Sequence, residues 1–505
     1  MALFETVLLL LVGATVLSVL ARRLGVPYPA LLAIGGALLA MIPGVPRLDL
    51  SPELIMCLFV APILLDAAHD ASLRDLRTNW LPILSMIVGA VALTTVAVAL
   101  VARLFLPDLP WAAALALGAL VAPPDAVAAL AVMRQLRPPY RLKIILEGES
   151  LLNDASALLI YKLAVGAVAV GSFSVSATLP TFLITVVGGA AIGWLAARPI
   201  SWLTSRFSDA SSSVIFQFAS TFGLWILVDH LQMSAVVAVV VFGATLSRQF
   251  GYRIPATIRI PSFAVWETAT VILNVLAFTL IGLQIRPIIE NLNGEELFEY
   301  LTVGGAILLG VIVVRLAWVM VHCVVFRLIF GLQTEGATGR SGLVVGWSGM
   351  RGIVTLAAAM ALPADFPYRD FMQMTAFLVV LGTLVLQGMT LRPLIVGLQL
   401  PHDGTVDEER QLAHRVALQE GLAALDGEPD EATRSLRTEY EEALAAVSSG
   451  NHPRETRTSA LRLKTIARSR SAVATLREEA RIGDESFQMV VADLDRQETA
   501  LRPDG

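Results

Sequence analysis

The sequence predicts an all-α polytopic membrane protein, with about thirteen transmembrane helices in residues 1–400 and a polar helical tail in residues 401–505. The first observation is composition: 56% of the 505 residues are hydrophobic, 16% are charged, and the mean hydropathy is +0.70. Soluble domains are about 45–50% apolar and about 25% charged. A soluble core does not absorb this much apolar surface, so we expect a lipid bilayer to do so.

The second observation is the recurrence of apolar stretches that approach the roughly 17–25 residues needed to cross a bilayer. The stretch at 233–247 is the shortest. We expect spans at residues 3–21, 28–44, 52–69, 80–105, 111–133, 141–170, 178–198, 211–229, 233–247, 264–283, 299–329, 339–362 and 371–398.

The third observation is the distribution of charge along the chain. Residues 401–505 carry 21 of the 42 acidic residues, so the net charge of −5 belongs to the tail. Alternate loops of the membrane domain carry fifteen basic residues, and the intervening loops carry four. Because basic loops favour the cytoplasmic side, we expect a multi-pass protein of the cell membrane with its N-terminus outside and its tail in the cytoplasm.

Ionisable residues inside spans are the candidate functional residues, because each costs about 2.5–3.5 kcal/mol to insert into a membrane. The sequence places these residues within spans: Asp66, Asp125, Glu149, Asp154, Glu267, Arg315 and Arg351.

Span five contains a strong helix breaker. Pro123 and Pro124 remove two backbone donors and obstruct the preceding turn, and Asp125 follows directly. We expect the helix to open at this point, and irregular backbone at membrane depth is tolerated only where it is buried or lines a cavity.

Span six has one polar face. At about 100° per residue, Glu149, Asn153, Ser150 and Asp154 fall within a wedge of about 140°. A carboxylate therefore lies on each flank of this face.

Span twelve is a second weakened helix, in which Gly349 and Gly352 surround Arg351. A permanent cation in a membrane needs a carboxylate partner. Spans five and twelve correspond if spans one to six repeat as spans eight to thirteen, and paired interruptions in repeats of inverted topology indicate a transporter site.

Carboxylates beside neutral oxygens suit Na+ or Li+ and make a poor site for zinc or copper. If a cation and a proton compete for such a site, exchange follows without ATP. K+ stays open as the cation, because ligand types do not fix the size of a cavity. A cation channel and an intramembrane hydrolase are the other candidate classes. The sequence has no Gly-x-Gly-Asp, His-Glu-x-x-His or Walker A motif, and we expect neither enzyme activity nor an organic cofactor.

These motifs resemble the sodium/hydrogen exchanger branch of the monovalent cation:proton antiporters. The resemblance covers residues 1–400, and it is most specific for GESLLNDA at 148–155, with support from GMRG at 349–352 and PILLDAA at 62–68. It implies a homodimer in which a core domain moves like an elevator against a dimerisation domain.

The resemblance also implies an ion site. Asp154 and Asp125 would bind Na+, with Ser150 and the backbone near Pro124 completing the oxygen shell. In span five the family usually has a threonine before the aspartate, whereas this chain has Pro124. Asp66 replaces the usual glutamate of span three, so we expect any contact from it to pass through water.

Three further roles follow from the resemblance. Asn153 would hold crossed, discontinuous spans five and twelve in place, and Glu149 would form a structural salt bridge with Arg351. Because Asn153 is neutral, the resemblance implies electroneutral exchange of one cation for one proton. Glu267 is expected to stabilise packing or an entrance, and Arg315 has no assigned partner.

Overall fold

The computed structural model describes residues 2–42, 51–133, 136, 138–170, 175–290, 292–330, 339–400, 404–426, 430–479, 481 and 484–501. Within these residues every regular element is a helix, which confirms the predicted fold class. The chain divides into two compact units, Met1–His402 and Asp403–Gly505.

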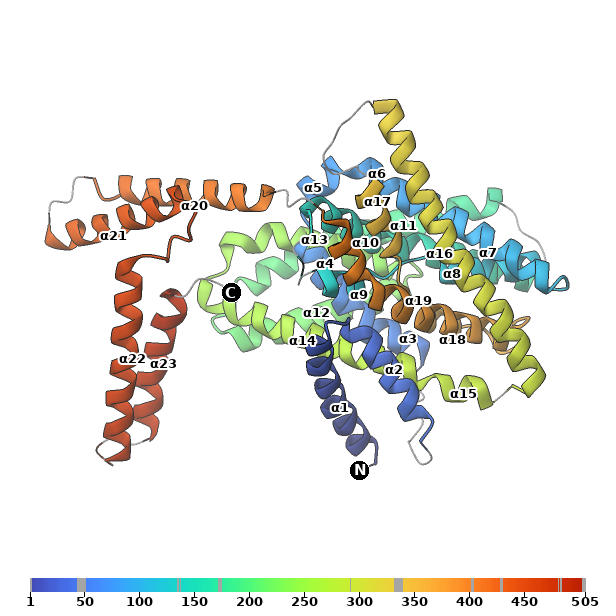
Figure 1. The fold of residues 1–505 in the computed structure, drawn as a ribbon, viewed down its shortest axis with the longest axis horizontal. Helices are drawn as coiled ribbons and strands as arrows, with labels where there is room; N and C mark the ends of the chain where they lie inside the picture. Colours follow the sequence, from blue (N-terminus) through green and yellow to red (C-terminus); the bar gives the residue numbers. More distant parts are fainter. Residues whose placement is uncertain are drawn as a thin grey trace. The chain divides into compact units, whose positions relative to one another are not determined.

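The first unit contains the helices drawn from blue to brown in Figure 1. Two π-helical turns, η1 and η2, interrupt regular α-helix in the third and fourth apolar stretches. In chain order the helices are α1 (Ala2–Leu24), α2 (Tyr28–Ala40), α3 (Pro52–Ile55), η1 (Met56–Val60), α4 (Ala61–Asp70), α5 (Leu73–Thr78), α6 (Trp80–Leu84), η2 (Ser85–Ala90), α7 (Val91–Phe105), α8 (Trp111–Val121), α9 (Ala126–Met133), α10 (Tyr140–Val170), α11 (Val175–Thr204), α12 (Ala210–His230), α13 (Ala235–Arg253), α14 (Ala256–Leu283), α15 (Ile285–Glu290), α16 (Gly294–Phe330), α17 (Gly339–Trp347), α18 (Ile353–Met360) and α19 (Arg369–Leu398).

In the described part of the chain, nine helical stretches are long and apolar enough to cross a membrane. They are Pro52–His69, Trp80–Phe105, Trp111–Met133, Tyr140–Val168, Leu183–Thr204, Ala210–His230, Ala256–Glu290, Gly294–Val325 and Arg369–Leu398. Three shorter apolar helices are Leu10–Ala21, Tyr28–Ala40 and Ala235–Arg248. Each overlaps a predicted span, and the remaining predicted span, 339–362, forms α17 and α18. The number of crossings stays a prediction.

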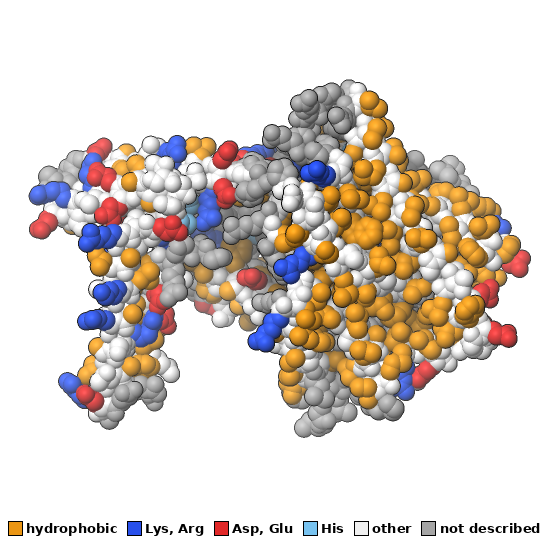
Figure 2. All heavy atoms as spheres, in the orientation of Figure 1, with side chains coloured by type: hydrophobic (Ala, Val, Ile, Leu, Met, Phe, Trp, Pro, Cys, Tyr) orange, Lys and Arg blue, Asp and Glu red, His pale blue; other side chains and the backbone are white. Residues whose placement is uncertain are grey.

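The surface of the first unit is apolar over most of the face that Figure 2 shows. Large side chains such as Leu104, Leu328 and Phe298 are 77%, 78% and 75% exposed. Exposed apolar area of this extent is unfavourable in water and favourable against lipid. The first unit is therefore a multi-pass membrane domain.

Arginine side chains lie over indole rings at the ends of these apolar helices. The guanidinium carbon is 4.4 Å from the ring centroid in the pair of Arg103 with Trp111 and 4.3 Å in the pair of Arg198 with Trp194. Tryptophan and snorkelling arginine are typical of the membrane–water interface. These pairs are suited to anchor the helix ends at that level.

Two of the apolar stretches are interrupted in the middle. The fifth forms α8 and α9, separated by residues 122–125, and the twelfth forms α17 and α18, separated by residues 348–352. The first break contains the two prolines and the second contains two glycines, as the local chemistry predicts.

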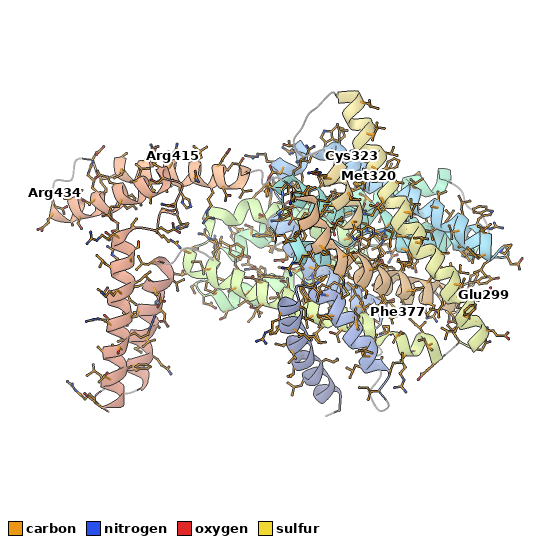
Figure 3. The ribbon with its side chains drawn as sticks, in the orientation of Figure 1. Glu299, Met320, Cys323, Phe377, Arg415 and Arg434 are labelled. Atoms are coloured by element: carbon orange, nitrogen blue, oxygen red, sulfur yellow. The ribbon has the colours of Figure 1, made fainter. Side chains whose placement is uncertain are left out.

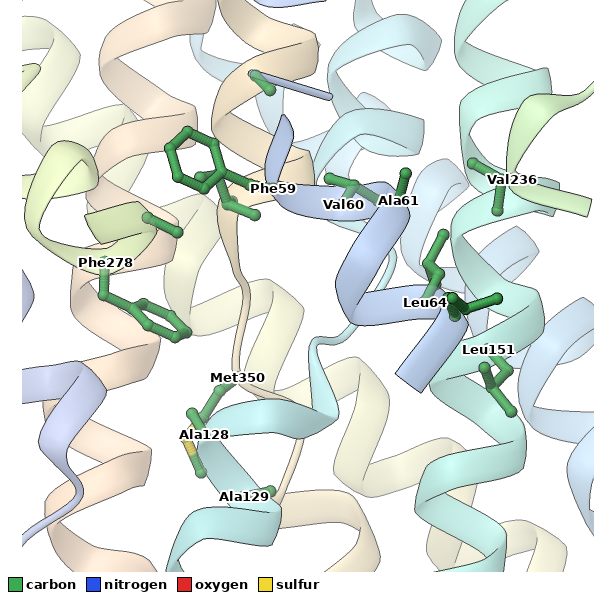
Figure 4. Packing of buried hydrophobic residues seen from close by; sticks show 14 of the residues in the cluster. Phe59, Val60, Ala61, Leu64, Ala128, Ala129, Leu151, Val236, Phe278 and Met350 are labelled. Carbon is green, nitrogen blue, oxygen red and sulfur yellow. The ribbon is translucent and has the colours of Figure 1, made fainter. Parts of the chain in front are cut away.

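A buried apolar cluster surrounds both interruptions. Figure 4 shows Phe59, Leu64, Leu151 and Phe278 in this cluster, which also includes Met350 of the second break. Met350 is completely buried. Close packing of this kind holds irregular backbone in one conformation, because the neighbouring side chains leave little room for alternatives.

The second unit consists of α20 (Thr405–Ala423), α21 (Glu431–Ser448), α22 (Arg457–Glu478) and α23 (Asp484–Leu501). Helices α20 and α21 pack against each other, as do α22 and α23. Arg470 of α22 donates hydrogen bonds of 2.5 Å to Asp495 and to Glu498 of α23. This unit is rich in charge, unlike the membrane domain.

Candidate ion-binding site

The structure brings two predicted carboxylates to one cavity. Asp125 and Asp154 both line it, together with Ser150. The walls come from α4, α9, α10, α14 and the first turn of α18. Within a mostly apolar lining, these side chains supply hard oxygen atoms, and Glu147 adds a third carboxylate to the wall.

Asp125 is held by the backbone of both interrupted helices. Its N–H donates to the carbonyl oxygen of Met350 over 2.7 Å, so the two breaks lie directly against each other. Its Oδ1 accepts a 2.8 Å hydrogen bond from the N–H of Val127. Asp125 thus caps the start of α9, where backbone donors lack helical partners.

Gly352 makes room for the other carboxylate oxygen of Asp125. A β-carbon on Gly352 would lie 1.8 Å from Oδ2 of Asp125. Such a contact is far shorter than any van der Waals separation, so only glycine fits here without displacement. The second break therefore shapes the space around the carboxylate of the first.

Ser150 and Asp154 project from the same side of α10, one helical turn apart. The Oγ of Ser150 accepts a hydrogen bond of 3.4 Å from the N–H of Ala126, the first residue of α9. Asp154 is 8% exposed. The polar face predicted for span six therefore meets the break in span five.

Glu149 pairs with Arg315, which corrects the predicted pairing with Arg351. Two hydrogen bonds of 2.5 and 2.8 Å join the guanidinium of Arg315 on α16 to both carboxylate oxygens of Glu149. The exposed fractions of the two side chains are 2% and 1%. A β-carbon on Gly349 would lie 2.2 Å from Cδ of Arg315, so the glycine of the second break lets this arginine reach its partner.

Arg351 instead bonds to backbone carbonyl groups. Its Nε donates to the oxygen of Val121 over 2.6 Å, and its Nη1 donates to that of Gly349 over 2.7 Å. Val121 is the last residue of α8, where carbonyl groups lack helical partners and a positive charge is favourable. The N–H of Arg351 donates to Oγ1 of Thr383 over 3.0 Å. Arg351 thus stabilises the end of α8 at the first break and the backbone of the second break.

Asn153 is completely buried and does not line the cavity. Its Nδ2 donates a 3.1 Å hydrogen bond to Oε1 of Glu149. Asn153 therefore contacts the Glu149–Arg315 pair and not the ion cavity.

Asp66 and Pro124 do not line this cavity in the described residues. Asp66 lines a separate cavity with Gln217 and Trp266, because Ile63 and Ala67 of the same helix take the side that faces Asp154. Pro124 is buried within the break, directly before Asp125. Glu267 is exposed on α14 and does not line the ion cavity.

Three polar residues of the cavity were not predicted as site residues. Glu147 on α10, Asn274 on α14 and Thr355 on α18 contribute to its wall. Asn274 and Thr355 carry no charge, so neither stands out by the cost of membrane insertion, and Glu147 lies 3.5 Å from Lys143 near the start of α10. The sequence does contain one signal for Asn274: it is the single amide side chain within the apolar run of residues 271–278.

The architecture defines a class of protein. A multi-pass membrane domain with two interrupted helices, whose breaks meet beside paired carboxylates, is a secondary transporter and not an enzyme.

Residues 7–397 match the family model for the sodium/hydrogen exchanger, transmembrane, and the chain belongs to this family of transporters. An uncharacterized Na+/H+ exchanger of Mycobacterium tuberculosis is 31% identical, over 98% of this chain and 96% of its own. The Na+/H+ antiporter ApNhaP of Aphanothece halophytica is 32% identical, over 82% of this chain and 79% of its own. The solved sodium proton antiporter MjNhaP1 from Methanocaldococcus jannaschii shares the fold. Its TM-score is 0.62 at 19% identity, over 79% of this chain and 99% of that chain.

Proposed function

We propose that this protein exchanges Na+ for H+ across the cell membrane without ATP. The observation that carries the proposal is the shared cavity of Asp125 and Asp154, beside the contact between the two helix breaks. The names of its relatives agree with this function, since they include a Na+/H+ exchanger and a Na+/H+ antiporter.

In the proposed cycle, Na+ is the transported substrate and takes its oxygen ligands from Asp154, Asp125 and Ser150, with a backbone carbonyl near Pro124. Carboxylate, hydroxyl and carbonyl oxygens suit a hard cation. Protons compete for the same carboxylates, so a site that binds one releases the other. Exchange is coupled if only the occupied forms change their side of access.

Asp66 is a supporting residue in this proposal and stands outside the oxygen shell. It lies on α4, which also forms a wall of the ion cavity, but its side chain lines the neighbouring one. Any effect of Asp66 on the ion therefore passes through water or through α4.

The Glu149–Arg315 pair and Arg351 have a structural role in the proposal. Their charges stay the same throughout the cycle. The net charge of these residues therefore does not change when a proton replaces Na+ in the cavity. Because Asn153 is neutral and Glu147 of the cavity wall pairs with Lys143 at 3.5 Å, Asp125 and Asp154 are the carboxylates that exchange charge with the substrate. We therefore propose electroneutral exchange, which an imposed membrane potential leaves unaltered.

The oligomeric state, the transport movement, the membrane topology and the choice of cation are also proposals. We propose that the protein is a homodimer in which the part carrying both breaks moves against the remaining helices, with the N-terminus outside and the tail in the cytoplasm. Li+ fits the same oxygen ligands as Na+, and K+ is the alternative cation.

Proton efflux from acid-loaded proteoliposomes tests the proposal. Addition of Na+ or Li+ dequenches an acid-sensing dye in vesicles with the wild-type protein, and Asp154→Asn reduces the signal to that of empty vesicles. Asp108→Asn, a change at an exposed loop position, keeps the wild-type rate. Dequenching with K+ alone makes K+ the substrate. A normal rate in Asp154→Asn contradicts the proposed site, and single-channel currents favour a channel.

A further inference from the structure

Glu147 places a third carboxylate on the wall of the ion cavity, on the same side of α10 as Asp154. It lies three residues before Ser150 and seven before Asp154. At about 100° per residue, Glu147 and Asp154 point within about 20° of each other, and the rise between them is about 10 Å. One side of α10 therefore presents a carboxylate, a hydroxyl group and a second carboxylate in succession.

Close packing holds the backbone beside Glu147. A β-carbon on the next residue, Gly148, would lie 2.7 Å from side-chain atoms of both Leu76 and Ile83. This turn of α10 therefore packs directly against α5 and α6. Position 147 is about 100° around the helix from that contact, and there Glu147 lines the cavity.

Exposure increases along this side of α10 towards its start. Asp154 is 8% exposed, whereas the side chains of Glu147 and Lys143 are 20% and 47% exposed. Glu147 therefore lies between the surface at the start of α10 and the carboxylate that we propose binds the ion. In the proposed topology this end of α10 is the cytoplasmic end.

Lys143 forms an ion pair with Glu147. Its Nζ lies 3.5 Å from Oε1 of Glu147, one helical turn further from Asp154. Solvent screens the exposed ammonium group more than the largely buried carboxylate, so the pair acts on the cavity mainly through its negative end. A glutamine at position 147 removes one negative charge from the cavity wall whichever groups contact the carboxylate.

Other charged groups lie near the start of α10. Arg141 donates a 3.1 Å hydrogen bond to Oδ1 of Asn79, and the carboxylate of Asp75 accepts one of 3.2 Å from the hydroxyl of Tyr140. The charged or titratable residues that line the neighbouring cavity are Asp66, His69 and Arg259. All of these groups are kept in a variant at Glu147, so a comparison with the wild type isolates the charge of Glu147.

We propose that Glu147 is the entry residue for the cation. Its fixed negative charge draws monovalent cations to the mouth of the cavity and strengthens their binding at Asp125 and Asp154. This role rests on the proposed exchange of Na+ for H+ at those two carboxylates. Because the attraction acts alike on Na+ and on H+, Glu147 sets how tightly both bind and leaves the stoichiometry of exchange unchanged.

Equilibrium binding of ²²Na+ to the full-length protein in a non-ionic detergent tests this role. At about pH 9 and an ionic strength of about 0.01 M, we expect Glu147→Gln to raise the dissociation constant for Na+ by about two- to fourfold. This is the Coulomb effect of one charge at about 10 Å for an effective dielectric constant of about 40–80. In about 0.3 M choline chloride the difference shrinks, because salt screens a partly exposed charge.

The pH dependence separates a charge effect from a distorted cavity. Glu147→Gln weakens proton binding by the same factor as Na+ binding, so protons compete less well in the variant. The ratio of its dissociation constant to that of the wild type therefore falls towards one as the pH is lowered. A distorted cavity that only weakens Na+ binding keeps the same ratio at every pH.

Lys143→Gln separates the charge of Glu147 from the ion pair as a structural unit. If Glu147 acts through its charge, loss of the lysine leaves the affinity for Na+ unchanged or strengthens it by less than about twofold. If the pair only holds α10 in place, both variants weaken binding in the same direction. Weaker binding in Lys143→Gln would overturn the proposal.

Glu299→Gln is the matched control. Glu299, labelled in Figure 3, is exposed on α16 and does not line the cavity. It should bind Na+ like the wild type, and melting curves confirm that each variant is folded. Wild-type affinity in folded Glu147→Gln at about pH 9 and low ionic strength, a ratio that is independent of pH, or an equal loss in Glu299→Gln would overturn the role of Glu147. Absence of saturable Na+ binding by the wild type would instead contradict the proposed function itself, and this role with it.

Discussion

Glu149, on the helix that carries Asp154, forms an ion pair with Arg315, and both side chains are almost completely buried. Removal of one member leaves an uncompensated charge in a medium of low dielectric constant, which costs about 3–5 kcal/mol. The bidentate geometry, with bonds of 2.5 and 2.8 Å, makes Arg315 the dominant partner of Glu149. The pair therefore fixes the helix that carries Asp154.

A double-mutant cycle on the free energy of unfolding tests this pairing. We predict that Glu149→Gln lowers this free energy by about 3–5 kcal/mol, and that Arg315→Gln adds much less in that background than it costs alone. Arg351→Gln should couple more weakly to Glu149→Gln than Arg315→Gln does, because Arg351 hydrogen-bonds to carbonyl groups and not to Glu149. Glu295→Gln, at an exposed position in the first turn of α16, serves as the control. Stronger coupling of Glu149 to Arg351 than to Arg315 would contradict the structure.

The partner of Glu149 was beyond sequence reasoning for a physical reason. Glu149 and Arg315 are 166 positions apart, and nothing in either segment specifies which helices become neighbours. Both Arg315 and Arg351 satisfy the rule that a membrane cation needs a compensating partner. The prediction for Arg351 was wrong because helix-end carbonyl groups supply that compensation as well as a carboxylate does.

At the scale of elements, the two helix breaks form one structural unit. The N–H of Asp125 in the first break bonds to the carbonyl of Met350 in the second. Gly352 leaves the space that Oδ2 of Asp125 occupies. A small change in one break must therefore displace a functional group in the other.

Gly352→Ala tests this dependence. Its β-carbon would lie 1.8 Å from Oδ2 of Asp125, so the carboxylate must move, and we predict that Na+-dependent proton efflux falls by at least about tenfold. Gly223→Ala on α12 is the control, since no atom lies within 4 Å of its β-carbon. If folded Gly352→Ala transports at the wild-type rate, the close approach of the two breaks has no functional role.

Sequence reasoning recovers the breaks better than the walls around them. Two adjacent prolines and a glycine-rich stretch act on their own helices, so their effects are local and predictable. The walls depend on which side of each helix faces inward. Asp66 illustrates the difficulty: its helix does line the ion cavity, but through other residues, and one position along a helix changes the direction by about 100°. Asn274 was not predicted to line the cavity for the same reason.

At the scale of the whole molecule, composition divides the chain into an apolar domain and a charged tail. The boundary between the two compact units falls after residue 402 of the chain, near the end of the apolar pattern. Composition reflects the solvent of each unit, lipid for one and water for the other, so it is visible without knowledge of any contact. Orientation depends on loop charge alone and stays a prediction.

Labelling of introduced cysteines tests the orientation. In a Cys57→Ser, Cys323→Ser background, we predict that a membrane-impermeant maleimide added to intact cells labels Asp108→Cys and not Arg468→Cys. Inverted membrane vesicles should give the opposite pattern, because the proposed topology places the loop of Asp108 and the tail with Arg468 on opposite sides of the membrane. Labelling of Arg468→Cys in intact, unlysed cells would reverse the proposed topology.

Competition between Na+ and H+ at Asp154 and Asp125 is the central claim, and equilibrium binding of ²²Na+ to the purified protein across a pH series measures it most directly. We predict saturable binding whose apparent affinity falls by up to about tenfold for each pH unit of acidification over the range in which a carboxylate takes up a proton. Asp154→Asn should abolish this binding, and Asp108→Asn should retain it. Na+ binding that is independent of pH, or that survives unchanged in Asp154→Asn, would contradict the claim.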